Sequence, residues 1–328
     1  MQKRDLRNLI GLLAAAAVTL GGQASAAAPQ GQAPAPQLML AVRTPSAATA
    51  AMLGATRAGN RIVAVGEHGV VLLSDDNGRH FRQAQSVPVR AMLTSVSFAD
   101  EKNGWAVGHA GVILHTGDGG ETWTLQRSDT EADQPLFSVL FSDRNHGLAV
   151  GLWSLLLETD DGGHTWRQRE LPAPPGATKA DRNLFRLFAA PDGKLFIAAE
   201  QGLVLRSTDQ GKSWRYLPTG YKGSLWAGAA GPDGALYVAG MCGTVYRSGD
   251  GGDSWRQVPS GTHSGLTDLV AAQGGVAGVG MEGASVRSNG TEGMAAATRP
   301  DRVDLNAVVL AADGKLIDFS SRGPLAPR

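Results

Sequence analysis

The sequence predicts an all-β fold of repeated four-stranded antiparallel sheets, and three observations lead to this prediction. A tight-turn element with the pattern Ser/Thr-x-Asp-x-Gly-x-x-Trp recurs along the chain. Glycine-rich hairpins precede these turns and begin 42, 43, 48, 41 and 40 residues apart, at Gly66, Gly108, Gly151, Ala199, Gly240 and Gly280. Glycine accounts for 44 of the 328 residues, which suits many tight turns. Short strands that repeat every ~40–45 residues indicate a β-propeller.

The N-terminus has the features of a Sec-type signal peptide over residues 1–26. Three basic residues, Lys3, Arg4 and Arg7, precede the apolar stretch Leu9–Leu20. That stretch is short for a membrane span, and small residues ending at Ala26 fit a cleavage site. We therefore expect export to the periplasm and a mature chain that does not span the membrane. An uncleaved anchor is the alternative.

Residues 27–45 are rich in Ala, Pro and Gln and are predicted to be a linker. Within them, Leu38–Val42 is apolar enough to be a strand. We expect it to supply the outer strand of the last blade, which would close the ring and cover two sheet edges. Residues 46–328 then form a single propeller domain.

The inner strand of each blade is predicted at residues 51–57, 93–98, 136–141, 184–189, 225–230, 266–271 and 305–310. This pattern gives seven blades. Six is the alternative, if the chain from Leu305 onward only completes the sixth blade, whose turn has lost the motif.

Each position of the recurrent turn has a structural role. The carboxylate accepts backbone N–H groups of its own turn, the glycine takes a positive φ, and the aromatic residue covers the seam to the neighbouring blade. The variant copy contains Asp76 and ends at Phe81. In the other copies the structural residues are Asp118, Gly120, Trp123, Asp161, Gly163, Trp166, Asp209, Gly211, Trp214, Asp250, Gly252 and Trp255. A unique catalytic site does not need five copies, so we predict no catalytic residue here.

Composition limits the possible functions. Thirty basic and 30 acidic residues give a formal net charge of zero, which offers no global electrostatic case for nucleic-acid binding. The one cysteine, Cys242, excludes an internal disulfide, and we expect its thiol to be half-buried. We expect a monomer without cofactor or metal ion.

The end of the ring opposite the recurrent turns is predicted to bind a partner. Its hairpin tips differ from blade to blade, which suits an irregular binding surface. Trp153 lies in the most apolar tip and is the predicted anchor. The candidate partner-binding residues are Glu67, His68, His109, Trp153, Glu200, Gln201, Tyr221, Met241, Glu282 and Arg322.

Two motifs resemble those of known families. The recurrent turn resembles the Asp-box, or BNR repeat, of sialidases and other propellers. The longer pattern Gly104-Trp105-Ala106-Val107-Gly108-x-x-Gly111 followed by TGDGGETW resembles the Ycf48-like family of photosystem II assembly factors and its relatives in non-photosynthetic bacteria. This resemblance implies a non-enzymatic, lumenal or periplasmic seven-bladed protein that helps a membrane-protein complex to assemble. The partner would be a photosystem or, in a non-photosynthetic host, a transporter or exporter.

The photosynthetic members of that family use a basic surface patch. In this sequence Arg206, Arg247 and Arg287 recur in register, whereas Leu73, His115 and Glu158 occupy the same position in the first three blades. At most half of the ring is therefore basic.

A sialidase-like or other Asp-box glycoside hydrolase is the competing interpretation. A sialidase needs an arginine triad, a tyrosine nucleophile and an acid, and other hydrolases use paired carboxylates. Glu67, Glu200, Glu282 and Asp268 are the carboxylates that could approach one another around the axis of the ring.

Overall fold

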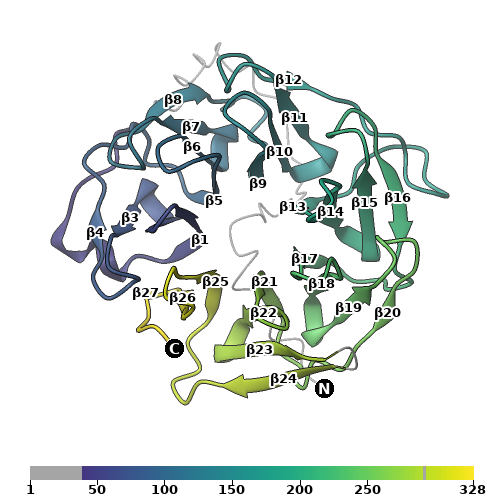
Figure 1. Cartoon of the computed structure of the whole chain (residues 1–328). Helices are drawn as coiled ribbons and strands as arrows, with labels where there is room; N and C mark the ends of the chain where they lie inside the picture. Colours follow the sequence, from purple (N-terminus) through teal and green to yellow (C-terminus); the bar gives the residue numbers. More distant parts are fainter. Residues whose placement is uncertain (1–38, 291–292) are drawn as a thin grey trace, which may run out of the picture. The chain divides into compact units, whose positions relative to one another are not determined.

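The computed structural model describes residues 39–290 and 293–328, which form seven antiparallel sheets arranged as the blades of a propeller (Figure 1). The predicted signal peptide and the linker up to residue 38 lie outside the described residues. Each sheet consists of strands consecutive in the chain. The structure confirms the all-β, seven-bladed prediction and excludes six blades.

The strands of blades one to three are β1 (Met52–Ala58), β2 (Arg61–Gly66), β3 (Val71–Ser74), β4 (Arg82–Gln83), β5 (Leu93–Phe98), β6 (Gly104–Gly108), β7 (Ile113–Thr116), β8 (Thr124–Arg127), β9 (Leu136–Phe141), β10 (Gly147–Gly151), β11 (Leu156–Thr159) and β12 (Arg167–Gln168). Those of blades four and five are β13 (Leu184–Ala189), β14 (Leu195–Ala199), β15 (Leu203–Ser207), β16 (Arg215–Pro218), β17 (Leu225–Ala230), β18 (Leu236–Gly240), β19 (Val245–Ser248) and β20 (Arg256–Gln257). Those of blades six and seven are β21 (Leu266–Ala272), β22 (Gly275–Gly280), β23 (Ala284–Asn289), β24 (Gly293–Thr298), β25 (Leu305–Leu310), β26 (Leu316–Ser320) and β27 (Gly323–Pro324).

The hydrophobic core is divided among the seams between neighbouring blades. Seven clusters of buried apolar side chains each join two adjacent blades. Between blades two and three, the rings of Trp105 and Phe141 stack with their centroids 3.5 Å apart. Between blades seven and one, Phe319 and Ile317 pack in one buried apolar cluster with Met52 and Ile62. The ring is therefore closed by an apolar seam like the other six.

The recurrent turn, which we call the aspartate turn, has the predicted geometry. In blade two, Asp118 Oδ1 accepts the Thr122 N–H at 2.9 Å and the Thr116 hydroxyl at 2.8 Å. Gly120 has φ of +91° and donates its N–H to Thr116 Oγ1 at 3.0 Å. The other four copies repeat the carboxylate hydrogen bonds and the positive φ at glycine.

Each aspartate turn docks on the preceding blade. A Cβ atom added to Gly211 of blade four would lie 2.7 Å from Leu148 Cδ1 of blade three. The aromatic residues that end the turns pack in the cluster shared with the preceding blade; they are Phe81, Trp123, Trp166, Trp214 and Trp255. The turns thus hold the seams, as predicted.

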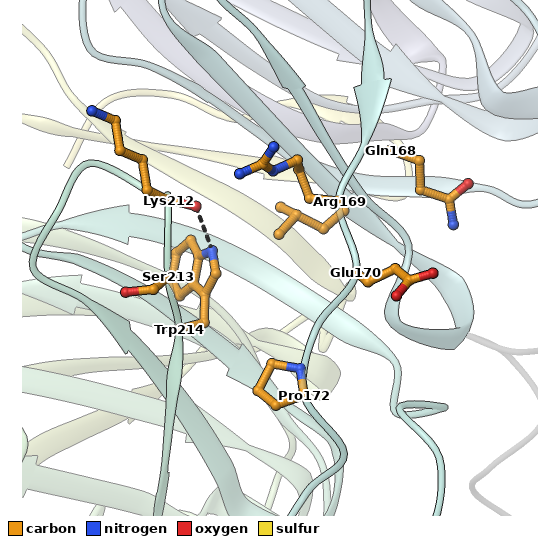
Figure 2. A pocket seen from close by; sticks show the side chains of 9 residues that line it. Gln168, Arg169, Glu170, Pro172, Lys212, Ser213 and Trp214 are labelled. Carbon is orange, nitrogen blue, oxygen red and sulfur yellow. Dashed lines mark hydrogen bonds between the residues drawn. The ribbon is translucent and has the colours of Figure 1, made fainter.

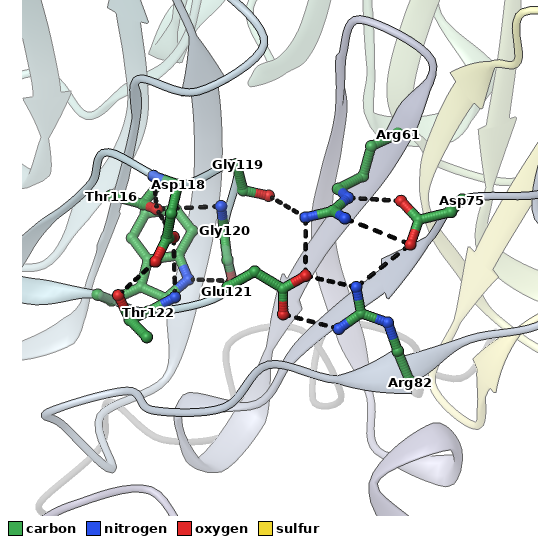
Figure 3. Close-up of polar contacts among 10 residues, drawn as sticks. Arg61, Asp75, Arg82, Thr116, Asp118, Gly119, Gly120, Glu121 and Thr122 are labelled. Carbon is green, nitrogen blue, oxygen red and sulfur yellow. Dashed lines mark hydrogen bonds and ion pairs between the residues drawn. The ribbon is translucent and has the colours of Figure 1, made fainter.

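Charged side chains reinforce the seam between blades one and two (Figure 3). Arg61 Nε lies 2.6 Å from Asp75 Oδ1, and its Nη1 donates to the Gly119 carbonyl at 3.1 Å. Arg82 Nη1 donates to Glu121 Oε2 at 2.7 Å. Blades four and five are joined similarly, because Arg206 Nη1 lies 2.8 Å from Asp253 Oδ1. Glu121 and Asp253 occupy the same position of their turns, and each pairs with an arginine of the preceding blade.

The prediction that Leu38–Val42 supplies the outer strand of the last blade is wrong for residues 39–42, the part that the structure describes. These residues form no strand, and blade seven has three strands. The segment lies on blade one instead: Ala41 donates its N–H to the Val87 carbonyl at 3.1 Å, and the Gln83 amide donates to the Val42 carbonyl at 3.0 Å.

Two features of the outer edge of blade seven disfavour the addition of a further strand. After β27 the chain continues beside β26, since Leu325 donates to the Asp318 carbonyl. Pro324 and Pro327 in this stretch have no N–H to donate to a further strand. The helix η1 (Pro45–Thr49) contacts β27 and β4 across the closing seam. Within the described residues, no helix has the length and hydrophobicity needed to cross a membrane.

Candidate functional site

The hairpin tips and the connections between blades lie at one end of the ring, because both follow strands that run in the same direction. We call this end the tip face and the opposite end, with the aspartate turns, the turn face. Six tips are single 3-10 turns: η2 (Glu67–Gly69), η3 (His109–Gly111), η4 (Leu152–Ser154), η5 (Glu200–Gly202), η6 (Met241–Gly243) and η7 (Met281–Gly283).

The six tips share one backbone conformation and differ in their side chains. The second residue of each tip has φ between 54° and 57°, in the left-handed region; these residues are His68, Ala110, Trp153, Gln201, Cys242 and Glu282. The first residue donates its N–H to the carbonyl just before its own inner strand, as in His109 to Met92 at 2.9 Å. The fold therefore fixes six side chains on one face without restricting their identity.

Trp153 is the predicted anchor, and its side chain is 59% exposed. Its N–H donates to Asn183 Oδ1 at 3.0 Å, and the N–H of Ser154 donates to the Arg182 carbonyl at 2.7 Å. Both Trp153 and Ser154 have positive φ, which is rare for a bulky residue and marks stored strain. The loop before blade four thus fixes the backbone that presents this large aromatic side chain to solvent.

Two of the predicted acids bind backbone instead of facing a common site. Glu67 Oε1 accepts the Ala51 N–H at 3.0 Å. Glu200 accepts the backbone N–H and the side-chain amide of Asn183, both at 2.9 Å. Each carboxylate fixes the start of its own inner strand, in blades one and four. Glu282 is exposed, and its Oε2 lies 3.8 Å from Arg302 Nη1.

The remaining predicted residues are spread around the ring. His68, Gln201 and Arg322 are exposed on blades one, four and seven. His109 is partly buried; burial lowers its pKa, and Asp133 opposes that shift. The Tyr221 hydroxyl donates to the Met241 carbonyl at 3.2 Å, which brings these two together. Cys242 was expected to be half-buried and is exposed, because the second residue of the tip points outward. The ten residues therefore form a broad surface and not one cluster.

The inner strands contain an ion pair that the sequence interpretation missed. Their third positions are Gly54, Ser95, Ser138, Arg186, Ala227, Asp268 and Ala307. Arg186 Nη2 lies 3.2 Å from Asp268 Oδ1, and Asp268 Oδ2 accepts the Val308 N–H at 3.0 Å. The Asp268 side chain is only 6% exposed. Burial raises its pKa, while Arg186 and the Val308 N–H act in the opposite direction. Two complementary charges among five small residues at equivalent positions are the signal that could have revealed this pair.

The residues at the second position of the inner strands lie at the tip-face end of the axis. They are polar in blades two, six and seven and aromatic in blades three, four and five. Polar side chains donate to the first carbonyl of the next inner strand: Thr94 to Leu136 at 2.6 Å and Thr267 to Leu305 at 2.7 Å. Asn306 likewise donates to Met52. Blades three, four and five carry aromatic residues there, which we call the aromatic arc: Phe137, Phe185 and Trp226.

The aromatic arc is partly exposed, and two of its three rings stack on each other. Phe137 and Phe185 stack with centroids 5.7 Å apart. Trp226 extends towards blade six. One of its ring carbons lies 2.7 Å from the position that a Cβ atom would occupy at Gly265. All three side chains are partly accessible to solvent.

A cavity of about 390 Å³ lies at the seam of blades three and four (Figure 2). It is lined by the aspartate turn of blade four and by residues 168–170 and Pro172. Arg169 in its wall pairs with Glu158 at 3.2 Å. Among the described residues, no group of three or more His, Cys, Asp or Glu side chains is placed to hold a metal ion.

The basic positions on the third strands are largely used inside the fold. Arg206 pairs with Asp253, and Arg247 lies 3.7 Å from Asp233 and donates to the Tyr237 hydroxyl at 3.1 Å. Arg287 is exposed. Ion pairing therefore removes two of the three arginines from a free basic patch.

Comparison with known proteins identifies the family. A family model described as Photosynthesis system II assembly factor YCF48 matches residues 83–138 and 126–276, which together span more than half of the chain. The chain belongs to this family. Among curated proteins, no sequence matches it.

Solved structures similar to this Ycf48-family chain show the same fold. A structure described as "YCF48 bound to D1 peptide" has a TM-score of 0.69 at 18% identity, covering 87% of this chain and 95% of that one. YCF48 from Cyanidioschyzon merolae has a TM-score of 0.66 at 16% identity, covering 88% and 97%. Virginiamycin B lyase from Staphylococcus aureus has a TM-score of 0.69 at 12% identity, covering 89% and 98%. At these identities the similarity shows the fold alone.

Proposed function

We propose that this Ycf48-family protein is a periplasmic, non-enzymatic assembly factor whose tip face binds a subunit of a membrane-protein complex. The family match and the related structure with a D1 peptide support a protein segment as the ligand. The complex is a photosystem or, in a non-photosynthetic host, a transporter or exporter. The signal-peptide pattern of residues 1–26 supports the periplasmic location.

The exposed side chain of Trp153, on a tip whose backbone is hydrogen-bonded to the loop before blade four, is the observation that carries this proposal. Tryptophan is enriched among the residues that dominate binding energy at protein interfaces. The other five tips have the same left-handed backbone at this position, and Trp153 is the one large apolar side chain among the six. A solvent-facing tryptophan held in this way fits an anchor for a protein partner.

A non-enzymatic role agrees with how the tip-face carboxylates are used. Glu67 and Glu200 are occupied by backbone N–H groups, and Asp268 is buried against Arg186. A glycoside hydrolase needs two carboxylates that flank one bond. Turnover of a panel of aryl glycosides that disappears on mutation of Glu67, Glu200 or Glu282 would contradict the proposal.

The binding proposal is tested by cross-linking pull-down from the native cell envelope with the full chain. We expect Trp153→Ala to reduce recovery of the membrane-protein partner at least tenfold, as for a side chain at the centre of an interface. The matched control is Leu125→Ala, since Leu125 is 41% exposed but lies on the outer strand β8. Equal recovery by the wild-type protein and folded Trp153→Ala would refute the anchor.

A further inference from the structure

Two exposed lysines lie in the loops of the tip face next to the aromatic arc. Lys179 and Lys222, in the loops leading to blades four and five, are exposed and form no ion pair within the described residues. Glu131 and Asp133, in the loop between blades two and three, are also exposed, and no ion pair of theirs is found in the same part of the chain. Lys179 and Lys222 therefore place two positive charges near blades four and five, and Glu131 and Asp133 place negative charge on the loop before blade three.

Arg186 adds a positive charge beside the aromatic arc. It follows Phe185 directly in the inner strand of blade four, and its side chain is 31% exposed. A guanidinium has five N–H donors, and the contact with Asp268 engages one amino group. Donors of Arg186 therefore remain for a second carboxylate, which arginine binds in a bidentate manner.

We propose that the tip face over blades three to five recognises a peptide segment in which a large apolar side chain is followed by a carboxylate. The apolar group lies on the aromatic arc, and the carboxylate binds Arg186. This inference rests on the proposed function and specifies the chemistry of the partner.

In the part of the chain that the structure describes, the other four blades carry no aromatic side chain at the second position of the inner strand. Thr94, Thr267 and Asn306 already donate to carbonyls of the next blade, so these side chains are committed within the fold. Lys179 and Lys222 add a long-range attraction for an acidic segment, which raises its association rate and makes binding sensitive to salt.

The inference is tested with the full chain and three acetylated, amidated 12-residue peptides of Gly and Ser, followed by NMR titration. Their central pairs are Phe-Glu, Phe-Gln and Ala-Glu. We expect the Phe-Glu peptide to bind at least tenfold more tightly than either of the others, because only it satisfies both the aromatic arc and Arg186. Equal affinities for the Phe-Glu and Phe-Gln peptides would overturn the inference.

Two variants separate specific from non-specific binding. Asp268→Asn removes the carboxylate that competes for Arg186, so it is expected to tighten binding of the Phe-Glu peptide several-fold and leave the Phe-Gln peptide unchanged. Phe185→Leu keeps an apolar side chain but loses the aromatic face, and is expected to weaken Phe-Glu binding. The control is Leu53→Ala, at the same strand position in blade one, with no expected change.

The outcomes distinguish this inference from the function on which it rests. If Trp153→Ala still prevents capture of a membrane protein but Asp268→Asn and Phe185→Leu leave Phe-Glu binding unchanged, the assembly function stands and the stated partner chemistry is wrong.

Discussion

Arg186 and Asp268 occupy the same position in the inner strands of blades four and six, and their side chains meet at 3.2 Å past blade five. The residue at that position in blade five is Ala227, whose small side chain leaves room for the contact. Asp268 in turn accepts the N–H of Val308 in blade seven. One ion pair thus links three blades around the axis.

Replacement of Arg186 by methionine is expected to destabilise the protein by about 3 kcal/mol at neutral pH. The substitution leaves the buried Asp268 carboxylate without its cation, and breaking a buried pair on one side is strongly destabilising. Denaturant unfolding followed by tryptophan fluorescence measures the effect. An unchanged unfolding midpoint would show that the pair contributes nothing to the fold.

The pH dependence of Arg186→Met gives a separate prediction. Burial raises the pKa of Asp268 above its ordinary value, so the folded state binds this proton more tightly than the unfolded state. Stability from this group is therefore present at low pH and is lost as pH rises through the folded pKa. Without Arg186 that pKa rises further. We therefore expect the difference in free energy of unfolding between the wild-type protein and the variant to shrink as pH is lowered from 7 towards roughly 5. A difference that grows on acidification would contradict the conclusion that Asp268 is the titrating group.

The contact of the aspartate turn with the preceding blade is tested by two glycine substitutions. Gly211 and Gly234 have φ of +91° and +80°, so alanine is strained at both. At Gly211 the new Cβ meets Leu148, whereas at Gly234 nothing lies within 4 Å. We expect Gly211→Ala to lower the free energy of unfolding by about 1–2 kcal/mol more than Gly234→Ala, since it overpacks a buried seam. Equal effects would mean that the turn is not a packed contact.

The carboxylates of the aspartate turns predict how the protein unfolds in acid. The hydroxyl and N–H of Thr165 lower the pKa of Asp161 to about 2, and those of Ser213 do the same for Asp209. Their stabilising contribution is present above the ordinary carboxyl pKa and is lost as pH falls from roughly 4 towards 2. Tryptophan fluorescence against pH checks this, because Trp166 and Trp214 end these turns. Asp209→Asn removes one titrating group and is expected to flatten the profile between pH 4 and 2; an identical profile would refute the contribution.

The fold could be predicted from sequence because its repeated features are local. The aspartate turns need only an acid, a glycine and an aromatic residue at fixed spacing, and the inner strands begin within one residue of the predicted positions. The closing strand could not be predicted, because apolarity alone does not say which edge Met39–Val42 contacts. Pro324 and Pro327 were the local signal against pairing with the last blade.

The site was only partly predictable for a related reason. Trp153 was recognisable as an apolar residue at a variable tip, but Glu67 and Glu200 looked like free loop acids until their backbone partners were known. Arg186 and Asp268 are 82 residues apart in the sequence, and their contact depends on the closure of the ring. Such a pair becomes visible only when equivalent positions of all blades are aligned.

The central claim, that the tip face binds the partner, is tested most directly by site-specific photo-cross-linking at Gln201 and Gln210. These two residues are both exposed, have φ of 57° and 62°, and lie just beyond opposite ends of the strand β15. With a photoreactive amino acid at one position at a time in the native envelope, we predict a cross-link to a membrane-protein subunit from position 201 and none from position 210. A cross-link from position 210 alone would place the partner on the turn face and contradict the claim.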